Sequence, residues 1–182
     1  MFKPLKKKPW RKPRSVPAGL RLYVVGDVHG NADALRDVFS RIDAEHTSWQ
    51  GRRPVQIFLG DYVDRGPASR EVLDLLIARN RTHELLVLKG NHEAMFLEFF
   101  DNPSLLGQWR QFGALQTLIS YGLKPSINPT LEEQKELARE LAQRLPPAHH
   151  KFIRGMPISF SCGDFFFAHA GVRPGISLKD QK

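Results

Sequence analysis

Four short polar clusters carry residue types that bind divalent metal ions. They are Gly26-Asp27-Val28-His29-Gly30, Gly60-Asp61-Tyr62-Val63-Asp64-Arg65-Gly66, Gly90-Asn91-His92-Glu93 and His169-Ala170-Gly171. Carboxylate oxygen and imidazole nitrogen together suit a borderline-hard divalent ion. The clusters contain no cysteine, which disfavours a structural zinc site. The glycines let the backbone turn sharply and leave space for metal ions and phosphate.

The spacing within the clusters has a physical logic. Asp27 and His29 are two residues apart, so an extended segment points both side chains the same way. Asp61 has two carboxylate oxygens and can bridge two ions, while Asn91 offers an amide oxygen and His169 an imidazole. Each cluster alone has an ordinary explanation, such as an incidental Asp-x-His or a core histidine. All four in order, each after an apolar run, are difficult to explain by chance.

The elements that must position these clusters are short strands. Apolar runs that predict buried strands occupy residues 20–25, 55–59, 85–88 and 165–168. Helical spacing follows the first run, and Ser69 could cap a helix after the second. Alternating strands and helices predict an α/β fold, in which ligands gather at the carboxyl ends of the strands. We therefore expect the four clusters to converge.

The middle of the chain is expected to be helical. Trp109, Phe112, Leu115 and Ile119 could form one buried stripe, and Thr130 with Glu133 predicts a capping box for a helix over 130–145. Residues 158–160 and 165–168 flank a plausible hairpin turn. His149 and His150, just after two prolines, are expected at the surface.

Composition limits the classes of protein to consider. The chain has 182 residues, 41% of them hydrophobic and 25% charged, which suits one soluble globular domain. No apolar run has the length of a membrane span. Cys162 is the single cysteine, so an internal disulfide is impossible and a cytoplasmic location is expected.

The basic charge is concentrated at the start of the chain. Residues 1–14 hold seven lysines and arginines and no acid, so seven of the eight net positive charges fall there. Because this basic segment also contains several prolines, residues 1–18 are expected to be a disordered tail, and residues 19–182 are expected to be the domain. The tail is either a solvated extension or a weak anchor for nucleic acid or anionic lipid. The nearly neutral body makes nucleic acid an unlikely partner otherwise.

The motifs Gly-Asp-x-His-Gly, Gly-Asp-x-Val-Asp-Arg-Gly and Gly-Asn-His-Glu resemble those of the calcineurin-like metallophosphoesterases, in their phosphoprotein phosphatase branch. The resemblance runs from about Leu20 to Lys182. Residues 109–113 and 117–122 are similar to a segment usual in bacterial members. Val63-Asp64-Arg65 favours the serine/threonine phosphatase-like group, with the symmetrical diadenosine tetraphosphatases as near relatives.

The resemblance implies a fold and a mechanism. The fold is a sandwich of two packed β-sheets flanked by helices. The first metal ion would be held by Asp27, His29 and Asp61, and the second by Asp61, Asn91 and His169. Manganese is expected, with iron or zinc as alternatives. The two ions would generate hydroxide from water to attack phosphorus.

The resemblance also implies roles for three further residues. His92 would be the general acid for the leaving group, oriented by Asp64. Arg65, together with Asn91, would contact the phosphate oxygens.

The resemblance breaks at the end of the chain. The family normally has a later Gly-His motif, which supplies another ligand to the second ion, and a later phosphate-binding arginine. Here the chain ends thirteen residues after His169. We expect a C-terminally truncated domain with an incomplete second sheet, and the alternative is a short form with a reorganised site.

Three kinds of function remain open from the sequence. The leading hypothesis is hydrolysis of phosphoserine or phosphothreonine on proteins, and a second is hydrolysis of a dinucleoside polyphosphate or another small phosphate ester. The third is a degenerate module that binds or regulates without catalysis. A phosphorylated protein or a small phosphate ester is the expected partner.

Overall fold

The computed structural model describes residues 14–48 and 51–181, so most of the predicted tail lies outside the described residues. The strands are β1 (Leu20–Val25), β2 (Arg53–Phe58), β3 (Leu85–Val87), β4 (Ser159–Cys162) and β5 (Phe165–Ala168). The α-helices are α1 (Ala32–Ser48), α2 (Ser69–Arg79), α3 (Asn91–Asp101), α4 (Leu106–Trp109), α5 (Ala114–Ser120), α6 (Leu131–Arg144) and α7 (Pro147–Arg154). Short 3-10 turns cover Pro103–Leu105, Arg110–Phe112 and Leu178–Asp180.

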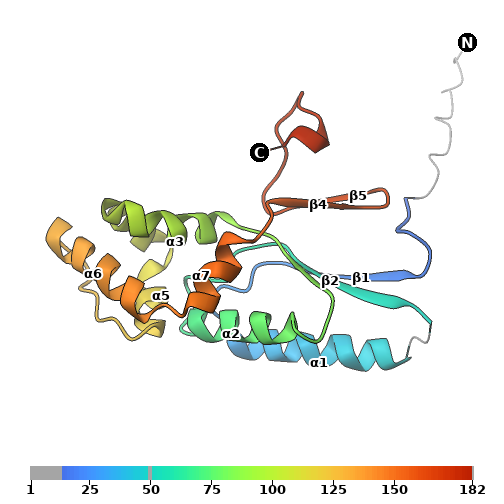
Figure 1. Ribbon diagram of the computed structural model, residues 1–182, viewed down its shortest axis with the longest axis horizontal. Coiled ribbons are helices and arrows are strands. Elements are labelled where there is room, and N and C mark those ends of the chain that lie inside the picture. Colours follow the sequence, from blue (N-terminus) through green and yellow to red (C-terminus); the bar gives the residue numbers. More distant parts are fainter. Residues whose placement is uncertain (1–13, 49–50, 182) are drawn as a thin grey trace, which may run out of the picture.

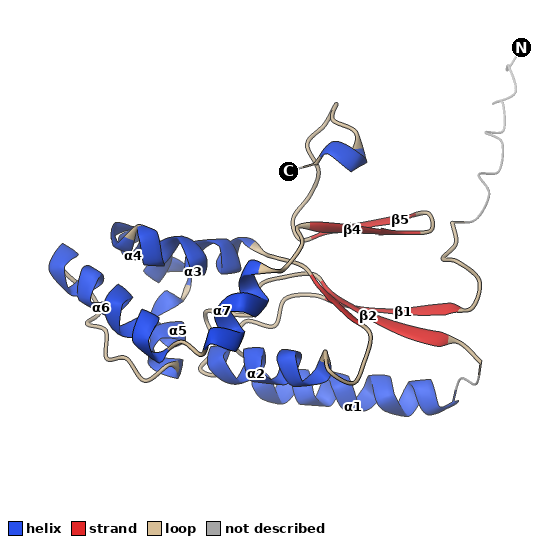
Figure 2. Cartoon of the chain, viewed as in Figure 1, coloured by secondary structure: helices blue, strands red, loops and turns tan. Residues whose placement is uncertain are grey.

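A parallel sheet in the order β1-β2-β3 forms the centre of the fold. Its middle strand, β2, is buried from Val55 to Phe58 without alternation, as expected where both faces of a parallel strand are covered. Helices α1 and α2 lie along one face (Figure 1). The antiparallel hairpin β4–β5 lies on the opposite side (Figure 2). The predicted α/β class with two sheets is confirmed, and the second sheet has two strands among the described residues.

The remaining helices form a second packed region beyond the carboxyl ends of the strands (Figure 1). Trp109, Phe96 and Phe99 pack together there, with ring centroids 6.0 Å and 5.4 Å from the indole. The predicted stripe through this region is wrong: Trp109 is buried, but Phe112 is 39% and Ile119 is 56% exposed. Gly113, with φ of 100°, separates α4 from α5, so no single helical period runs through the segment.

Two local predictions about helix starts have different outcomes. The capping box of α6 is confirmed, because Glu133 N donates to Thr130 Oγ1 and Thr130 N donates to Glu133 Oε2. The proposed cap by Ser69 is wrong. Ala68 is the N-cap of α2, and Ser69 Oγ instead accepts from the backbone N–H of Asp64 at 3.1 Å.

His149 is also placed differently from the expectation. It is buried between α2 and the end of α5, and its ring lies 2.8 Å from the Tyr121 hydroxyl and 2.9 Å from Asp74 Oδ1. The reason is that Pro147 begins a new helix, α7, which packs against α2. The surface position expected from the neighbouring prolines is therefore wrong, because α7 packs His149 against α2.

The hairpin β4–β5 is less buried than the rest of the fold. None of residues 157–181 is fully buried. Its turn contacts the segment before β1, because Asp164 N donates to Ser15 O and Ser15 N donates to Asp164 Oδ2, both at 3.1 Å. The described helices include none with the length and apolar character needed to cross a membrane.

Candidate active site

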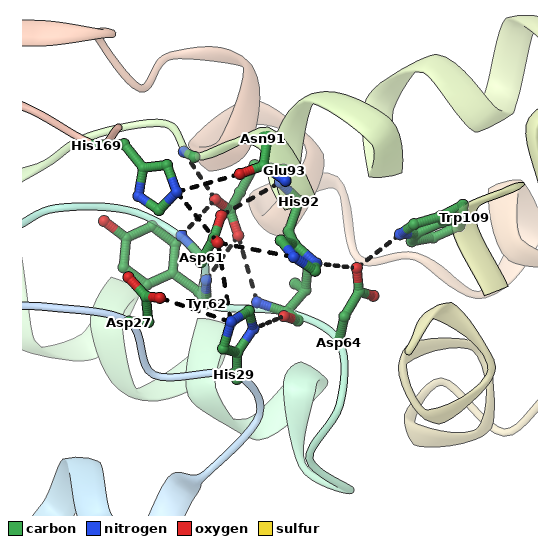
Figure 3. A network of polar contacts seen from close by, with 12 residues as sticks. Asp27, His29, Asp61, Tyr62, Asp64, Asn91, His92, Glu93, Trp109 and His169 are labelled. Carbon is green, nitrogen blue, oxygen red and sulfur yellow. Dashed lines mark hydrogen bonds and ion pairs between the residues drawn. The ribbon is translucent and has the colours of Figure 1, made fainter. Parts of the chain in front are cut away.

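Asp61 lies at the centre of the four polar clusters (Figure 3). Its side chain follows β2 and is almost fully buried, with 4% of the residue exposed. Asp61 Oδ2 is 3.1 Å from His169 Nε2, 3.8 Å from His29 Nε2 and 3.7 Å from His92 Nε2. Two compact groups of possible ligands share it, one with His29 and His92 and the other with Asp27 and His169. The structure thus brings these residues together from three strand ends and the start of α3.

The two candidate imidazole ligands are oriented by backbone carbonyls. His29 Nδ1 lies 3.0 Å from Val63 O, and His169 Nδ1 lies 3.2 Å from Leu59 O, so each can donate its Nδ1–H there. With Nδ1–H donated in this way, Nε2 is the nitrogen available to a metal ion, and it is directed at Asp61. Metal-ligating histidines are typically fixed in this way.

The His29 imidazole supplies a direct test of whether a metal ion fits. Its Nε2 is buried and has no hydrogen-bond partner within the described residues. It lies 3.8 Å from both Asp27 Oδ2 and Asp61 Oδ2. A lone pair facing two carboxylates is unfavourable without a cation, because buried polar atoms need a partner. The donor set therefore fits a divalent metal ion.

The backbone around the site is strained. Within the described residues, positive φ occurs outside glycine at four positions, all in these clusters: His29, Asp61, Asp64 and Arg65. Such conformations cost on the order of 1–3 kcal/mol each and persist only when surrounding contacts hold them. Their concentration here indicates a segment shaped for function.

Glu93 holds this segment in place. Its buried carboxylate accepts the backbone N–H of Asp61 at 2.9 Å, of Tyr62 at 2.7 Å and of Val63 at 3.3 Å, and also that of Gly90 at 2.9 Å. Burial raises the pKa of Glu93, and these N–H donors only partly offset it. This role of Glu93 is not among those predicted from the sequence. Its place in the Gly-Asn-His-Glu motif was the available signal.

A buried carboxylate–imidazole pair meets the ligand groups at His92, which belongs to one of them. His92 Nδ1 is 2.6 Å from Asp64 Oδ2, and both residues are essentially inaccessible to solvent. Burial would lower the pKa of His92, but the hydrogen bond to Asp64 and the charges of Asp61, Asp64 and Glu93 outweigh it, so the pKa is raised. The pair therefore favours the protonated imidazole, as a proton donor requires.

The two predicted phosphate contacts are at the edge of the site. Asn91 is the first residue of α3, is exposed, and places Oδ1 3.2 Å from His169 Nε2. Arg65 is exposed, and its backbone N–H donates to Gly113 O at 3.3 Å. No described residue forms a hydrogen bond or ion pair with its guanidinium. The structure thus puts Arg65 on the same loop as Asp61 and Asp64, without joining its side chain to the network.

Close packing between the start of α3 and the loop after β2 depends on Gly90, which has no side chain. A Cβ on Gly90 would lie 2.6 Å from the backbone nitrogen of Asp61 and closer still to its carboxylate. The start of α3 can therefore approach the loop after β2 only because this position lacks a Cβ.

Comparisons with known proteins agree with this geometry. The family described as calcineurin-like phosphoesterase matches residues 20–179. The zinc-dependent endopolyphosphatase of Saccharomyces cerevisiae is 28% identical over 163 residues, covering 85% of this chain and 48% of the yeast protein. Serine/threonine-protein phosphatase 2 of Escherichia coli is 39% identical over 80 residues, covering 44% of this chain and 33% of that protein.

A solved structure supports the fold. The crystal structure described as "a putative diadenosine tetraphosphatase" superimposes with a TM-score of 0.56 at 22% identity, covering 92% of this chain and 58% of that one. The chain spans less than two thirds of the length of each of these relatives. The family match covers most of the chain, and the ligand groups occupy the strand ends within it. The chain belongs to the calcineurin-like phosphoesterase family.

Proposed function

We propose that the chain carries the catalytic centre of a metal-dependent phosphomonoesterase that acts on phosphoserine or phosphothreonine. The observation that supports this is the gathering of Asp27, His29 and His169 around Asp61, with His92 in contact with both Asp61 and Asp64. One ion would be held by Asp27, His29 and Asp61, and the other by Asp61, Asn91 and His169. When bound, the ions supply a nucleophile from water at neutral pH and offset the charge of the phosphoryl group.

The chain's own residues then position the substrate and move a proton. His92 keeps its Nδ1–H on Asp64 and directs Nε2 toward Asp61, where it can protonate the departing oxygen. The exposed guanidinium of Arg65 offers a fork of donors for phosphate oxygens, and the exposed Asn91 amide is the second candidate contact.

A second candidate is hydrolysis of a phosphoanhydride, in a dinucleoside polyphosphate or in inorganic polyphosphate. The relative named as an endopolyphosphatase supports it, because it aligns with 85% of this chain. The Asp64–His92 pair favours the monoester instead. A serine alkoxide needs a proton to leave, whereas a phosphate is already a good leaving group.

Substrate comparison tests this choice. Hydrolysis of a phosphoserine peptide, diadenosine tetraphosphate and polyphosphate would be measured with manganese, iron and zinc in turn. We expect manganese-dependent release of phosphate from the peptide. Turnover of the anhydrides alone would favour the second candidate. Metal binding without turnover of any substrate would favour a binding or regulatory module.

Replacing His92 tests the proton donor. His92→Asn should lower turnover of an alkyl phosphate by roughly 100- to 10,000-fold, the usual contribution of general acid catalysis, while metal content is kept. The loss should be smaller on nitrophenyl phosphate, whose leaving group needs less protonation.

His83→Asn, outside the site, is the matched control and should behave as the parent. Equal losses from His92→Asn on the two substrates would contradict proton donation.

A further inference from the structure

The surroundings of Asp64 contain two side chains that the proposed chemistry does not yet use. Trp109 Nε1 donates to Asp64 Oδ2 at 2.6 Å, and Thr117 Oγ1 donates to Asp64 Oδ1 at 2.6 Å. Both come from the helical segment α4–α5, some 45 and 53 residues further along the chain. Figure 3 shows the Trp109 indole directed at the Asp64 carboxylate from the side opposite His92.

The two donors from α4 and α5 to the Asp64 carboxylate follow from the chemistry of their groups. An indole N–H is a donor only, so Asp64 Oδ2 must accept from Trp109. Thr117 Oγ1 accepts the Asp64 backbone N–H at 2.8 Å, lies 3.0 Å from Ser69 Oγ, and sends its own proton to Asp64 Oδ1. Both Asp64 oxygens thus accept a hydrogen bond from this segment.

This arrangement has a consequence for His92. A carboxylate with its oxygens fixed by Trp109 and Thr117 presents Oδ2 to His92 in one orientation, 2.6 Å from Nδ1. One N–H of the imidazole is therefore held on Nδ1, and Nε2, which would carry the proton that is donated, is directed toward Asp61 and the ligand groups.

Burial makes the two contacts strong. Trp109, Thr117 and Asp64 are each 0% exposed, so water cannot replace a missing donor. Hydrogen bonds to a buried charged group are stronger than those between neutral groups.

We propose that Trp109 and Thr117 are positioning residues, which hold the Asp64 carboxylate so that His92 is presented as proton donor to the leaving group. This inference rests on the proposed phosphoesterase function. It assigns α4 and α5 a part in catalysis, in addition to packing. The residues need not touch substrate, because they act through Asp64.

The experiment compares substitutions that remove one donor and keep the shape. Trp109→Phe retains a ring against Phe96 and Phe99 but deletes the N–H. Thr117→Val deletes the hydroxyl, and Thr117→Ser restores it. Thr82→Val, on the exposed turn after α2, is the matched control and should leave turnover unchanged.

Turnover is measured on an alkyl phosphate and on nitrophenyl phosphate, with metal content determined for each variant. Trp109→Phe and Thr117→Val should each lower kcat on the alkyl phosphate by about 10- to 100-fold, the usual effect of losing an outer-shell partner. The loss on nitrophenyl phosphate should be smaller, KM and metal content should stay near the parent values, and Thr117→Ser should recover much of the loss. Equal losses on both substrates, or no recovery with serine, would overturn the inference.

A second readout does not depend on activity. In protein with ¹⁵N-labelled histidine, the Nδ1–H of His92 should give a strongly downfield proton signal, identified by its absence in His92→Asn. Thr117→Val should weaken or shift that signal, while Thr117→Ser and Thr82→Val preserve it. If the parent hydrolyses no phosphate ester, the proposed function fails, yet this signal still tests the positioning. A signal unchanged in Thr117→Val and Trp109→Phe would show that the two residues serve packing alone.

Discussion

At the residue scale, the site is organised by carboxylates with different tasks. Asp61 is shared by the two ligand groups, Asp64 accepts from His92, and Glu93 accepts backbone N–H groups. Their positions in the sequence are similar, because each lies within a glycine-containing motif. Their contacts differ, so Asp61 is a candidate metal ligand, Asp64 orients His92, and Glu93 supports the backbone.

Asp61 should be the most sensitive ligand. Asp61→Ala should bind less metal than Asp27→Ala or Asn91→Ala, because Asp61 belongs to both ligand groups. Its turnover should fall by more than about 100-fold, since outer-shell changes alone cost about 10- to 100-fold. Metal analysis and phosphate release measure both effects, with the exposed Asp33→Ala as control. Equal metal occupancy in Asp61→Ala and the parent would exclude the shared role.

Glu93 should matter for stability as well as for activity. Glu93→Gln places amide hydrogens against backbone N–H donors, so we expect a loss of about 1.5–3 kcal/mol in the free energy of unfolding, the range for hydrogen bonds to charged groups. Denaturant unfolding measures it. The exposed Glu98→Gln, on the same helix α3, should change stability by less than about 0.5 kcal/mol. Similar losses of unfolding free energy in Glu93→Gln and Glu98→Gln would show that the four N–H contacts of Glu93 add little to stability.

At the element scale, the site depends on how closely the loops approach one another. The start of α3 packs against the loop after β2 through Gly90, and α5 reaches the same loop through Thr117. The ends of β1, β2 and β3 place three of the motifs at one edge of the parallel sheet. Contacts from Glu93 in α3 and Thr117 in α5 then hold the loop that carries Asp61 and Asp64.

A single added methyl group should disturb this packing. Gly90 has φ of −88°, which alanine adopts readily, so Gly90→Ala acts through its Cβ alone. That Cβ would contact Asp61, and we expect weaker metal binding and at least about a 10-fold loss of turnover, the lower end of the effect of disturbing a ligand's support. Gly107→Ala is the matched control, because its Cβ would meet open space. Unchanged metal affinity in Gly90→Ala would mean that the loops can separate without cost.

At the scale of the whole molecule, stability is distributed unevenly. The buried core runs through the three-stranded sheet and helices α1 to α7 and reaches Met156. Beyond it, Ile158, Val172 and Leu178 are about half exposed. His169, a candidate metal ligand, follows directly after the less buried hairpin.

Hydrogen exchange should reveal this distribution. Amides of β2 should exchange slowest and those of β4–β5 much faster, because local opening is easier where few side chains are buried. Added manganese or zinc should slow exchange around His169 more than in the remote helix α6, since a ligand stabilises the conformation that binds it. Uniform protection of both sheets, or no metal effect at His169, would contradict this distribution.

Sequence alone determined the features that depend on local pattern and strand polarity. The motifs follow apolar runs, and parallel strands end at one edge, so the approach of Asp27 and Asp61 could be predicted. The expected approach of His169 has a different origin, because it follows β5 in the separate antiparallel hairpin. The capping box of α6 could also be read from two residues three apart. The roles assigned to the site residues remain predictions, to be tested by the variants above.

The tertiary structure decided what depends on contacts distant in sequence. The bonds from Trp109 and Thr117 to Asp64, and the burial of His149 against α2, have no local signature. The predicted stripe through residues 109–119 failed for a related reason. Helical periodicity describes one continuous helix, whereas the positive φ of Gly113 redirects the chain between two short ones. Which side chains are buried then depends on how these helices pack against the site.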